Sequence, residues 1–278
     1  MRAYLAEFLS DPRVVELPRW LWLPLLHGLV LRRRPAQSAQ KYAKIWTAAG
    51  SPLAVNTARQ AALLRQASGV QVEYAMRYGE PAIAGALRRF SAPPLVIPLY
   101  PQYARSTTES IRDVIGPSAR MVEDFHQHPG YIAALAGLVG ALPDVLVMSF
   151  HGLPQRAVDR GDPYRDQCLR TAELLAHALG LPRERYRVTF QSRFGPARWL
   201  QPYTAQVLAQ LGAARTRRVA VICPGFVADC LETLEEIAIE GAQAFRAAGG
   251  GDFRAIPCLN DSPRWIAALA DIATSSSA

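Results

Sequence analysis

The sequence predicts an α/β fold in which parallel sheets are flanked by helices. The chief observation is that short apolar segments, typical of buried strands, alternate with amphipathic segments that are typical of helices. Hydrophobic residues make up 50% of the 278 residues and charged residues 19%, so the chain can bury a large core and global disorder is excluded. This length suits one large domain or two lobes.

Five segments are predicted to form buried strands, because each is rich in Val, Ile, Leu or aromatic residues and ends at polar, Pro or Gly residues. In chain order they are Val70–Met76, Leu95–Leu99, Asp144–Phe150, Tyr186–Gln191 and Arg218–Cys223. The strand signal is missing from about residue 105 to residue 140. We therefore predict two lobes, residues 1–125 and residues 126–278.

Helical segments are predicted between and after these strands. They are Asn56–Ala67, Arg170–Leu179, Thr204–Leu211 and Pro263–Ile272. Gly180 and Gly212 are expected to end the second and third, and Asp261 or Ser262 to cap the start of the last. Strands that alternate with helices indicate βαβ units, and hence a parallel sheet that is covered on both faces.

The charge and the motifs exclude several classes of protein. The chain has 31 Lys and Arg against 23 Asp and Glu, and only Lys41 and Lys44 are lysines. This net charge of +8 is the only support for a nucleic-acid partner, which we do not expect because no RNA-binding motif or focused basic helix accompanies it. The absence of G-x-G-x-x-G and G-x-x-x-x-G-K-[ST] removes the main support for dinucleotide or nucleotide binding.

The cysteines and the most apolar segment predict a cytoplasmic protein. No two of the four cysteines form a C-x-x-C pair, so a structural zinc site is not expected. No secretory signal opens the chain, and a reducing compartment is the default. The most apolar segment, Leu17–Leu31, contains Pro18, Arg19 and Pro24 and is too short to span a bilayer.

Two predicted strands deliver unusual polar groups to their carboxyl ends, which is where ligands bind in open α/β sheets. His151 follows one of them and is succeeded by Gly152. Imidazole titrates near neutral pH, so His151 can accept a proton there. The alternative is a loop histidine that is only hydrogen-bonded.

The second strand end leads into a predicted acidic helix. Glu232, Glu236 and Glu240 are four residues apart, so they form one stripe on that helix. A row of carboxylates is better tolerated if cations visit it. The alternative is a solvated acidic start of a helix, which the helix dipole favours. If His151 and these glutamates line one crevice, the site suits a reaction in which a divalent cation enters the substrate as protons leave it.

Longer motifs around these residues resemble the ferrochelatase family. They are Gly50–Leu53, Pro98–Tyr103 with Ser106–Thr108, Ser149–Pro154, Asp159–Tyr164, Phe190–Gly195, Trp199–Thr204, Pro224–Glu240 and Leu259–Asn260. The resemblance runs in order from about Phe8 to Ile272 without a large gap. It implies two Rossmann-like lobes with a porphyrin cleft between them, and a lyase that inserts Fe²⁺ into protoporphyrin IX to form protohaem, the last step of haem biosynthesis.

The resemblance also assigns site residues. The family's active-site histidine matches His151 and its active-site glutamate matches Glu232. Its line of acidic residues on a π-distorted helix matches Glu236 and Glu240, so these four residues are expected to handle the metal. An arginine–tyrosine pair at the porphyrin cleft matches residues Arg77 and Tyr78. Aromatic side chains are further candidates for the cleft wall, and these are Trp20, Trp22, Tyr100 and Trp199. The alternative for each of them is plain packing in the core.

The chain also departs from the family pattern. Ferrochelatases begin with a buried strand before the segment that matches Tyr4–Leu9, whereas this chain begins at Met1. We expect the first strand to be missing, and this raises the alternative of a catalytically impaired porphyrin- or haem-binding protein. A chelatase for coproporphyrin III or a cobalt substrate is another alternative, although Phe150–Pro154 and Pro224–Phe226 favour protoporphyrin.

The resemblance finally implies partners and location. Some members hold an iron–sulfur cluster in a C-terminal extension, but the chain ends at Ala278, so neither a cluster nor any other prosthetic group is expected. Leu17–Leu31 matches the family's membrane-facing cleft lip, and Arg32–Arg34 follow it, so we expect a peripheral contact with an anionic membrane. The alternative is an amphipathic core helix with a solvated end. We expect a monomer.

Overall fold

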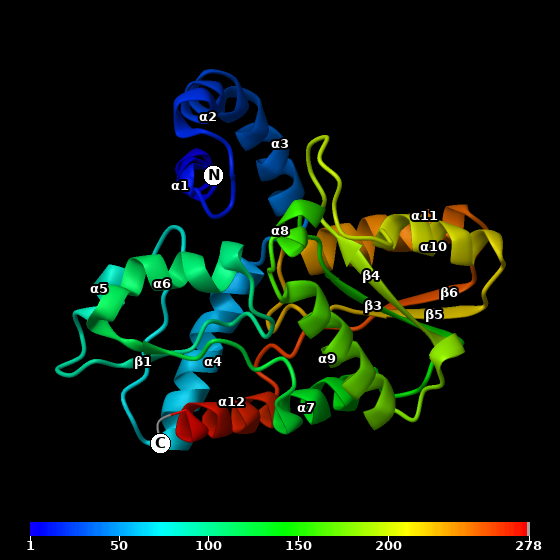
Figure 1. The fold of residues 1–278 in the computed structure, drawn as a ribbon. Helices are drawn as coiled ribbons and strands as arrows, with labels where there is room; N and C mark the ends of the chain where they lie inside the picture. Colours follow the sequence, from blue (N-terminus) through cyan, green and yellow to red (C-terminus); the bar gives the residue numbers. More distant parts are fainter. Residues whose placement is uncertain (277–278) are drawn as a thin grey trace.

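The computed structural model describes residues 1–276, and its largest feature is a four-stranded sheet (Figure 1). The strand order is β4-β3-β5-β6, and every neighbouring pair is parallel. The strands are β3 (Val145–His151), β4 (Tyr186–Gln191), β5 (Arg218–Ile222) and β6 (Asp252–Ala255). The parallel sheet is therefore confirmed, and β6 is a strand that the sequence analysis missed.

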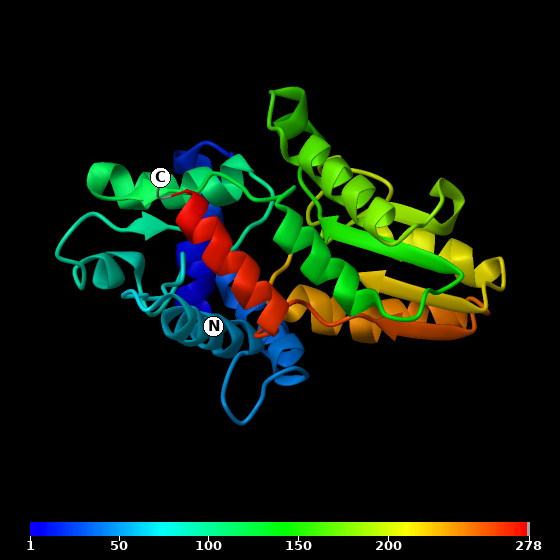
Figure 2. The same cartoon turned by 90° about the horizontal axis from the view of Figure 1, so that it is seen from below.

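Helices cover both faces of this sheet because the strand side chains alternate between two cores (Figures 1 and 2). On one face, Leu146, Met148 and Phe150 pack with α7 (Pro129–Val139) and α9 (Tyr164–Ala178). The opposite face packs against helices α10 (Thr204–Ala213) and α11 (Ala242–Ala247) and against η5 (Glu232–Gly241). Its main contributors are Val147, Leu208, Val219, Val221, Ile237 and Phe245. A strand that is buried on both faces lacks the polar alternation of an exposed sheet, as the apolar run in β3 shows.

A smaller parallel sheet of two strands lies in the N-terminal part of the chain. It pairs β1 (Leu95–Val96) with β2 (Arg120–Met121). The prediction of a strand at Val70–Met76 is wrong: this segment makes only an isolated bridge, in which Met76 N donates to Pro81 O at 2.8 Å. A strand needs a neighbour for its backbone groups, and none of the strands within residues 1–276 pairs with this segment.

Gly212 does not end its helix as predicted, because α10 continues to Ala213. A Cβ at this position would collide with the backbone oxygen of Phe245 in α11. Gly212 is therefore required for the close approach of two helices rather than as a helix stop.

One helix near the end of the chain packs against helices from both parts of it. The last helix, α12 (Pro263–Ser275), packs against α7 and also against α4 (Pro52–Ser68), as Figure 2 shows. The predicted division near residue 125 falls between the two sheets. The two lobes stay a prediction, since α12 belongs to the later part and packs on the earlier one.

The N-terminal helices form a cap that stands out from the rest of the molecule (Figure 1). The cap consists of α1 (Arg2–Ser10), α2 (Arg19–Leu25), the π-helix η1 (Leu26–Val30) and α3 (Leu31–Ala43). A small core of Leu5, Leu9, Leu26 and Leu31 holds it together.

The remaining elements are short. They are α5 (Ile83–Leu87), η2 (Arg105–Glu109), α6 (Ser110–Ile115), η3 (Gly116–Ser118), α8 (Gln155–Asp159) and η4 (Arg183–Arg185). Within residues 1–276, none of the helices combines the length and apolarity that crossing a membrane requires.

Candidate active site

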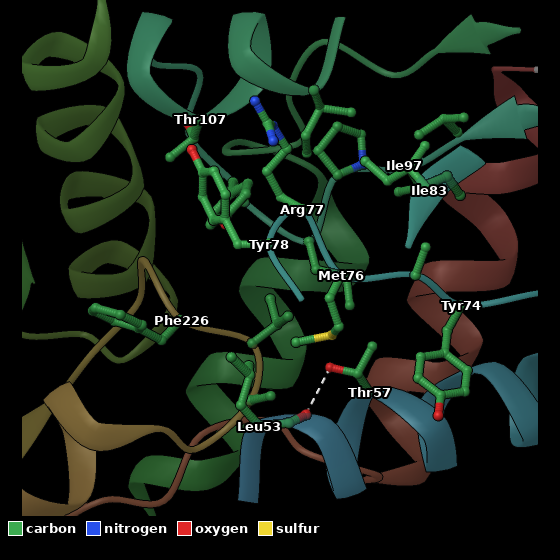
Figure 3. A pocket seen from close by; sticks show the side chains of 18 of the residues that line it. Leu53, Thr57, Tyr74, Met76, Arg77, Tyr78, Ile83, Ile97, Thr107 and Phe226 are labelled. Carbon is green, nitrogen blue, oxygen red and sulfur yellow. Dashed lines mark hydrogen bonds between the residues drawn. The ribbon is translucent and has the colours of Figure 1, made fainter. Parts of the chain in front are cut away.

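A cavity of about 1590 Å³ lies where the cap, the small sheet and the carboxyl ends of the large sheet meet. It is larger than typical small-ligand pockets of roughly 300–1,000 Å³, so it has room for a macrocycle. His151, Glu232, Arg77 and Tyr78 all line it. Figure 3 shows part of its wall, where Arg77 and Tyr78 lie on one segment and Phe226 lies on the loop after β5. The structure therefore brings these four predicted residues to one cavity.

His151 is the last residue of β3, and its ring is held in one tautomer. Its Nδ1 lies 2.6 Å from the carbonyl oxygen of Gly152, and a carbonyl only accepts, so Nδ1 carries the proton and donates. The neutral ring then keeps the lone pair on Nε2. The hydroxyl of Tyr164 donates to the backbone oxygen of His151 at 2.9 Å and fixes the strand end. His151 is thus prepared to accept a proton through Nε2.

The predicted acidic helix is η5, a π-helix over Glu232–Gly241. This confirms the π-distortion that the resemblance implied. A π-helix closes i→i+5 hydrogen bonds, and such segments are rare and frequent at functional sites. Glu232 opens η5 and lines the main cavity. Glu236 and Glu240 line a second cavity of about 310 Å³, and Glu232 lines this cavity as well. Glu232 therefore stands where the two cavities meet.

Gln191 ties the histidine loop to the acidic helix. It ends β4 beside His151 in the parallel register. Its backbone oxygen accepts from Gly152 N at 2.7 Å, and its side-chain Nε2 donates to the backbone oxygen of Glu232 at 2.9 Å. Gln191 was not predicted from the sequence, although its place at the end of a strand that neighbours β3 was an available signal.

Glu236 is held by the loop that follows β4. Its carboxylate accepts from Ser192 N at 2.8 Å and from Ser192 Oγ at 2.5 Å. Ser192 has φ of 65°, the left-handed region, which costs a non-glycine residue of order 1–3 kcal/mol. The loop thus adopts an unfavourable backbone conformation at the residue that aims two donors at this carboxylate.

Glu235 and the two lysines form a cluster that the sequence analysis missed. Lys41 Nζ lies 2.9 Å from Glu235 and 2.9 Å from Glu240, and Lys44 Nζ lies 2.9 Å from Glu235. Burial alone would raise the pKa of Glu235, but the hydrogen bonds from both lysines outweigh it and hold that pKa below its ordinary value. The available signal was that the only two lysines of the chain are three residues apart, at the end of one helix.

The predicted metal residues do not gather round a single point. Among residues 1–276, no three His, Cys, Asp or Glu side chains lie close enough to hold one metal ion together. His151, Glu232, Glu236 and Glu240 therefore do not form a single ligand set.

Asp11 organises the arginine–tyrosine pair. Its carboxylate accepts from Arg77 Nη2 at 2.6 Å, from the Tyr78 hydroxyl at 2.7 Å and from Ser110 Oγ at 2.5 Å. The guanidinium carbon of Arg77 also lies 4.5 Å from the centre of the Tyr78 ring. Asp11 is 7% exposed, and burial is the main cause that raises the pKa of Tyr78. Asp11 was not predicted from the sequence, because it lies far from its partners along the chain.

The aromatic candidates divide into two groups. Tyr100 and Trp199 line the main cavity, as predicted. Trp20 does not, because its side chain is 79% exposed on the cap, and Trp22 instead donates its indole N–H to the backbone oxygen of Leu9 at 2.6 Å. Tyr42 is a further aromatic residue of the wall. Burial, followed by the nearby Glu232 carboxylate, raises the pKa of Tyr42 to about 12, so its hydroxyl stays protonated.

Comparison with known proteins decides the family. The ferrochelatase family model matches residues 1–277. This chain belongs to the ferrochelatase family. The ferrochelatase of Azoarcus sp. (strain BH72) is 56% identical over 292 residues, which cover 97% of this chain and 80% of that protein. The ferrochelatase of Aromatoleum aromaticum is 54% identical over 300 residues, covering 99% and 82%.

Two solved structures share the fold at low sequence identity. SirB from Bacillus subtilis with Fe³⁺ matches with a TM-score of 0.55 and 16% identity over 82% of this chain and 92% of that chain. The multi-domain protein DR2241 from Deinococcus radiodurans matches with a TM-score of 0.53 and 15% identity, covering 81% and 52%. These likenesses confirm the predicted α/β chelatase-like fold.

Membership of the ferrochelatase family also decides between the alternatives. Ferrochelatases are lyases that form nitrogen–metal bonds by inserting Fe²⁺ into protoporphyrin IX, and this chain is an enzyme of that class. The alternatives of a catalytically impaired binding protein and of a chelatase for another tetrapyrrole are not favoured.

Proposed function

We propose that this ferrochelatase inserts Fe²⁺ in the main cavity, with His151 accepting the pyrrole protons and Glu232 transferring the metal. The observation that carries the proposal is that both side chains line the same cavity of about 1590 Å³. His151 comes from the end of β3 and Glu232 from the start of η5, and Gln191 links the two segments.

The chemistry of the substrate explains why two such groups are needed. A free-base porphyrin carries two central N–H protons and is nearly planar, so the metal enters only after the nitrogen lone pairs turn out of the plane. A cavity that binds the distorted ring better than the flat ring lowers this barrier. Two protons leave as Fe²⁺ enters, which balances the charge. His151 Nε2 accepts a proton, and the half-buried ring can release it to solvent before it accepts the second.

The acidic line supplies the metal in this proposal. The second cavity is lined by Glu236 and Glu240 and shares Glu232 with the main cavity, so these carboxylates form the proposed route for Fe²⁺. Carboxylates at separate points suit a cation that moves, because no single set of ligands traps it.

Arg77 is proposed to meet the polar edge of the porphyrin. Its Nε and Nη2 are held by Ser110 and Asp11, and the guanidinium lies beside Tyr78 at the wall of the cavity. A planar guanidinium of fixed orientation is suited to binding a carboxylate, and protoporphyrin IX carries two. No resident cofactor is needed, since Fe²⁺ and the porphyrin are both substrates.

A Soret-band assay tests the proposed function. Purified protein is mixed with protoporphyrin IX and either Zn²⁺ or anaerobic Fe²⁺, and the metalloporphyrin is followed spectroscopically. We expect metalation well above the rate without protein. A rate equal to the protein-free rate would contradict the proposal.

We also propose that the protein acts as a cytoplasmic monomer that rests on an anionic membrane through the cap. The cap exposes large apolar side chains, with Trp20 79%, Leu21 52% and Leu29 46% exposed, next to the basic run Arg32–Arg34. Apolar contact and attraction to anionic headgroups both favour such binding, at about 1 kcal/mol per basic residue near the surface.

Trp20 is the side chain to test in this surface. We expect vesicles containing anionic lipid to sediment the protein at low salt, and Trp20→Ala to weaken this retention because it removes the most exposed apolar group. Trp46→Ala, a change at an exposed tryptophan outside the cap, is the matched control. Equal retention of both variants, or none for the unmodified protein, would refute this contact.

A further inference from the structure

The cap and the acidic helix are joined by two ammonium groups. Lys41, on α3, contacts Glu235 and Glu240 at 2.9 Å each. Lys44, which directly follows α3, contacts the other oxygen of Glu235 at 2.9 Å. These are the only two lysines in the chain. Both ammonium groups contact carboxylates of η5, the helix that is proposed to carry the metal.

The two carboxylates in this cluster differ in burial. The Glu235 side chain is 1% exposed, and each of its oxygens contacts a different lysine. A buried carboxylate needs such partners, so Glu235 is a fixed structural anchor. The Glu240 side chain is 47% exposed and contacts Lys41 alone among the described lysines. An exposed pair of this kind is weak and can exchange one cation for another.

Lys41 also lies between the two cavities. It lines the main cavity and the second cavity, and Glu240 lines the second. Other residues of α3, including Arg34 and Ser38, form part of the wall of the main cavity. Arg34 further contacts the loop after β4, with its guanidinium carbon 5.5 Å from the centre of the Phe194 ring. α3 therefore borders both the main cavity and the second cavity.

We propose that Lys41 is a latch between α3 and η5 which an arriving divalent cation releases by displacing its ammonium from Glu240. Lys41 stays paired with Glu235 only, so α3 is held less tightly and the wall of the main cavity loosens when metal is present. Lys41 is a positioning residue in this scheme, because it acts through Glu240 and α3. The inference rests on the proposed function, since it uses the same route for iron.

Zn²⁺ binding without porphyrin tests the competition. Isothermal titration calorimetry compares the unmodified protein with Lys41→Met, Lys41→Arg and Lys44→Met. An exposed ion pair of this strength corresponds to a factor of about two to five, so we expect Lys41→Met to bind Zn²⁺ about two- to fivefold more tightly. Lys41→Arg restores a cation and is expected to match the unmodified protein. Lys44→Met removes the same charge from the same segment without touching Glu240, so it is expected to show no gain.

Two further variants identify the carboxylate involved. We expect Glu240→Gln added to Lys41→Met to abolish the gain in Zn²⁺ affinity. An equal gain in Lys44→Met, or no gain in Lys41→Met, would overturn the proposal, because the effect would then be general charge removal or absent. Thermal unfolding shows whether each variant is folded. Lys41→Arg keeps the positive charge and serves as the folded comparison.

Amide hydrogen exchange tests the link to α3. We expect Zn²⁺ to speed exchange across residues 31–43 in the unmodified protein, and Lys41→Met to show that faster exchange without Zn²⁺. Unchanged exchange across this segment would overturn the latch. The calorimetry and hydrogen-exchange measurements use no porphyrin. A failure of the Soret assay would therefore refute the proposed function, whereas the Zn²⁺ measurements alone test the latch.

Discussion

Replacing His151 with Ala lowers the rate of metal insertion by about 10²–10⁴-fold while protoporphyrin IX still binds. His151 is the end residue of β3, and Nδ1 is committed to the carbonyl oxygen of Gly152, so the reaction depends on the lone pair of Nε2. An alanine removes that acceptor. We expect the rest of the cavity lining, including Gly152 and Phe226, to be unaffected, so that the ring still binds.

The measurement separates binding from chemistry. Porphyrin affinity is followed by fluorescence quenching, and turnover by the Soret band under saturating Zn²⁺. His177→Ala is the matched control, because His177 is exposed on α9 and is not among the residues that line the main cavity. Turnover of His151→Ala within a few-fold of the control would show that another group takes the protons.

Replacing Asp11 with Ala destabilises the fold by about 3–5 kcal/mol. Its carboxylate accepts hydrogen bonds from Arg77, Tyr78 and Ser110, and the Arg77 side chain is only 16% exposed. Removing Asp11 leaves a largely buried guanidinium without its counter-charge. The loss also frees Arg77 from its orientation, so the apparent KM for porphyrin is expected to rise.

Asp113→Ala is the control for this change. Asp113 pairs with Arg13 at 2.8 Å, but their side chains are 48% and 36% exposed. The expected cost is about 0–1 kcal/mol, as for other exposed pairs. Urea unfolding followed by circular dichroism gives both free energies, provided that the slope against urea is the same for each variant. Equal losses for the two variants would mean that Asp11 is not a buried anchor.

Local pattern predicted much of the C-terminal half. The strand expected at Tyr186–Gln191 is present with those bounds, and Arg218–Cys223 differs from β5 by one residue. The segment Val70–Met76 has the same apolar character but forms no strand. Apolar periodicity reports burial, whereas a strand also needs a partner at hydrogen-bonding distance, and one segment alone does not reveal that partner.

The candidate site was also predicted only in part, because local pattern does not reveal partners that are distant in the sequence. His151 and Glu232 were found because each follows a strand, and strand ends meet at one edge of a parallel sheet. Lys41 and Asp11 were not found, because their partners are distant in sequence: Lys41 and Glu235 are 194 residues apart, and Asp11 and Arg77 are 66 apart. Only the packing of the cap against both halves brings these charges together.

A crystal structure with protoporphyrin IX bound tests the central claim most directly. The account predicts that the ring occupies the main cavity, with Nε2 of His151 facing the pyrrole nitrogens from one side and the Glu232 carboxylate facing them from the other. A ring bound outside this cavity, or one that places both side chains on the same side, would contradict it.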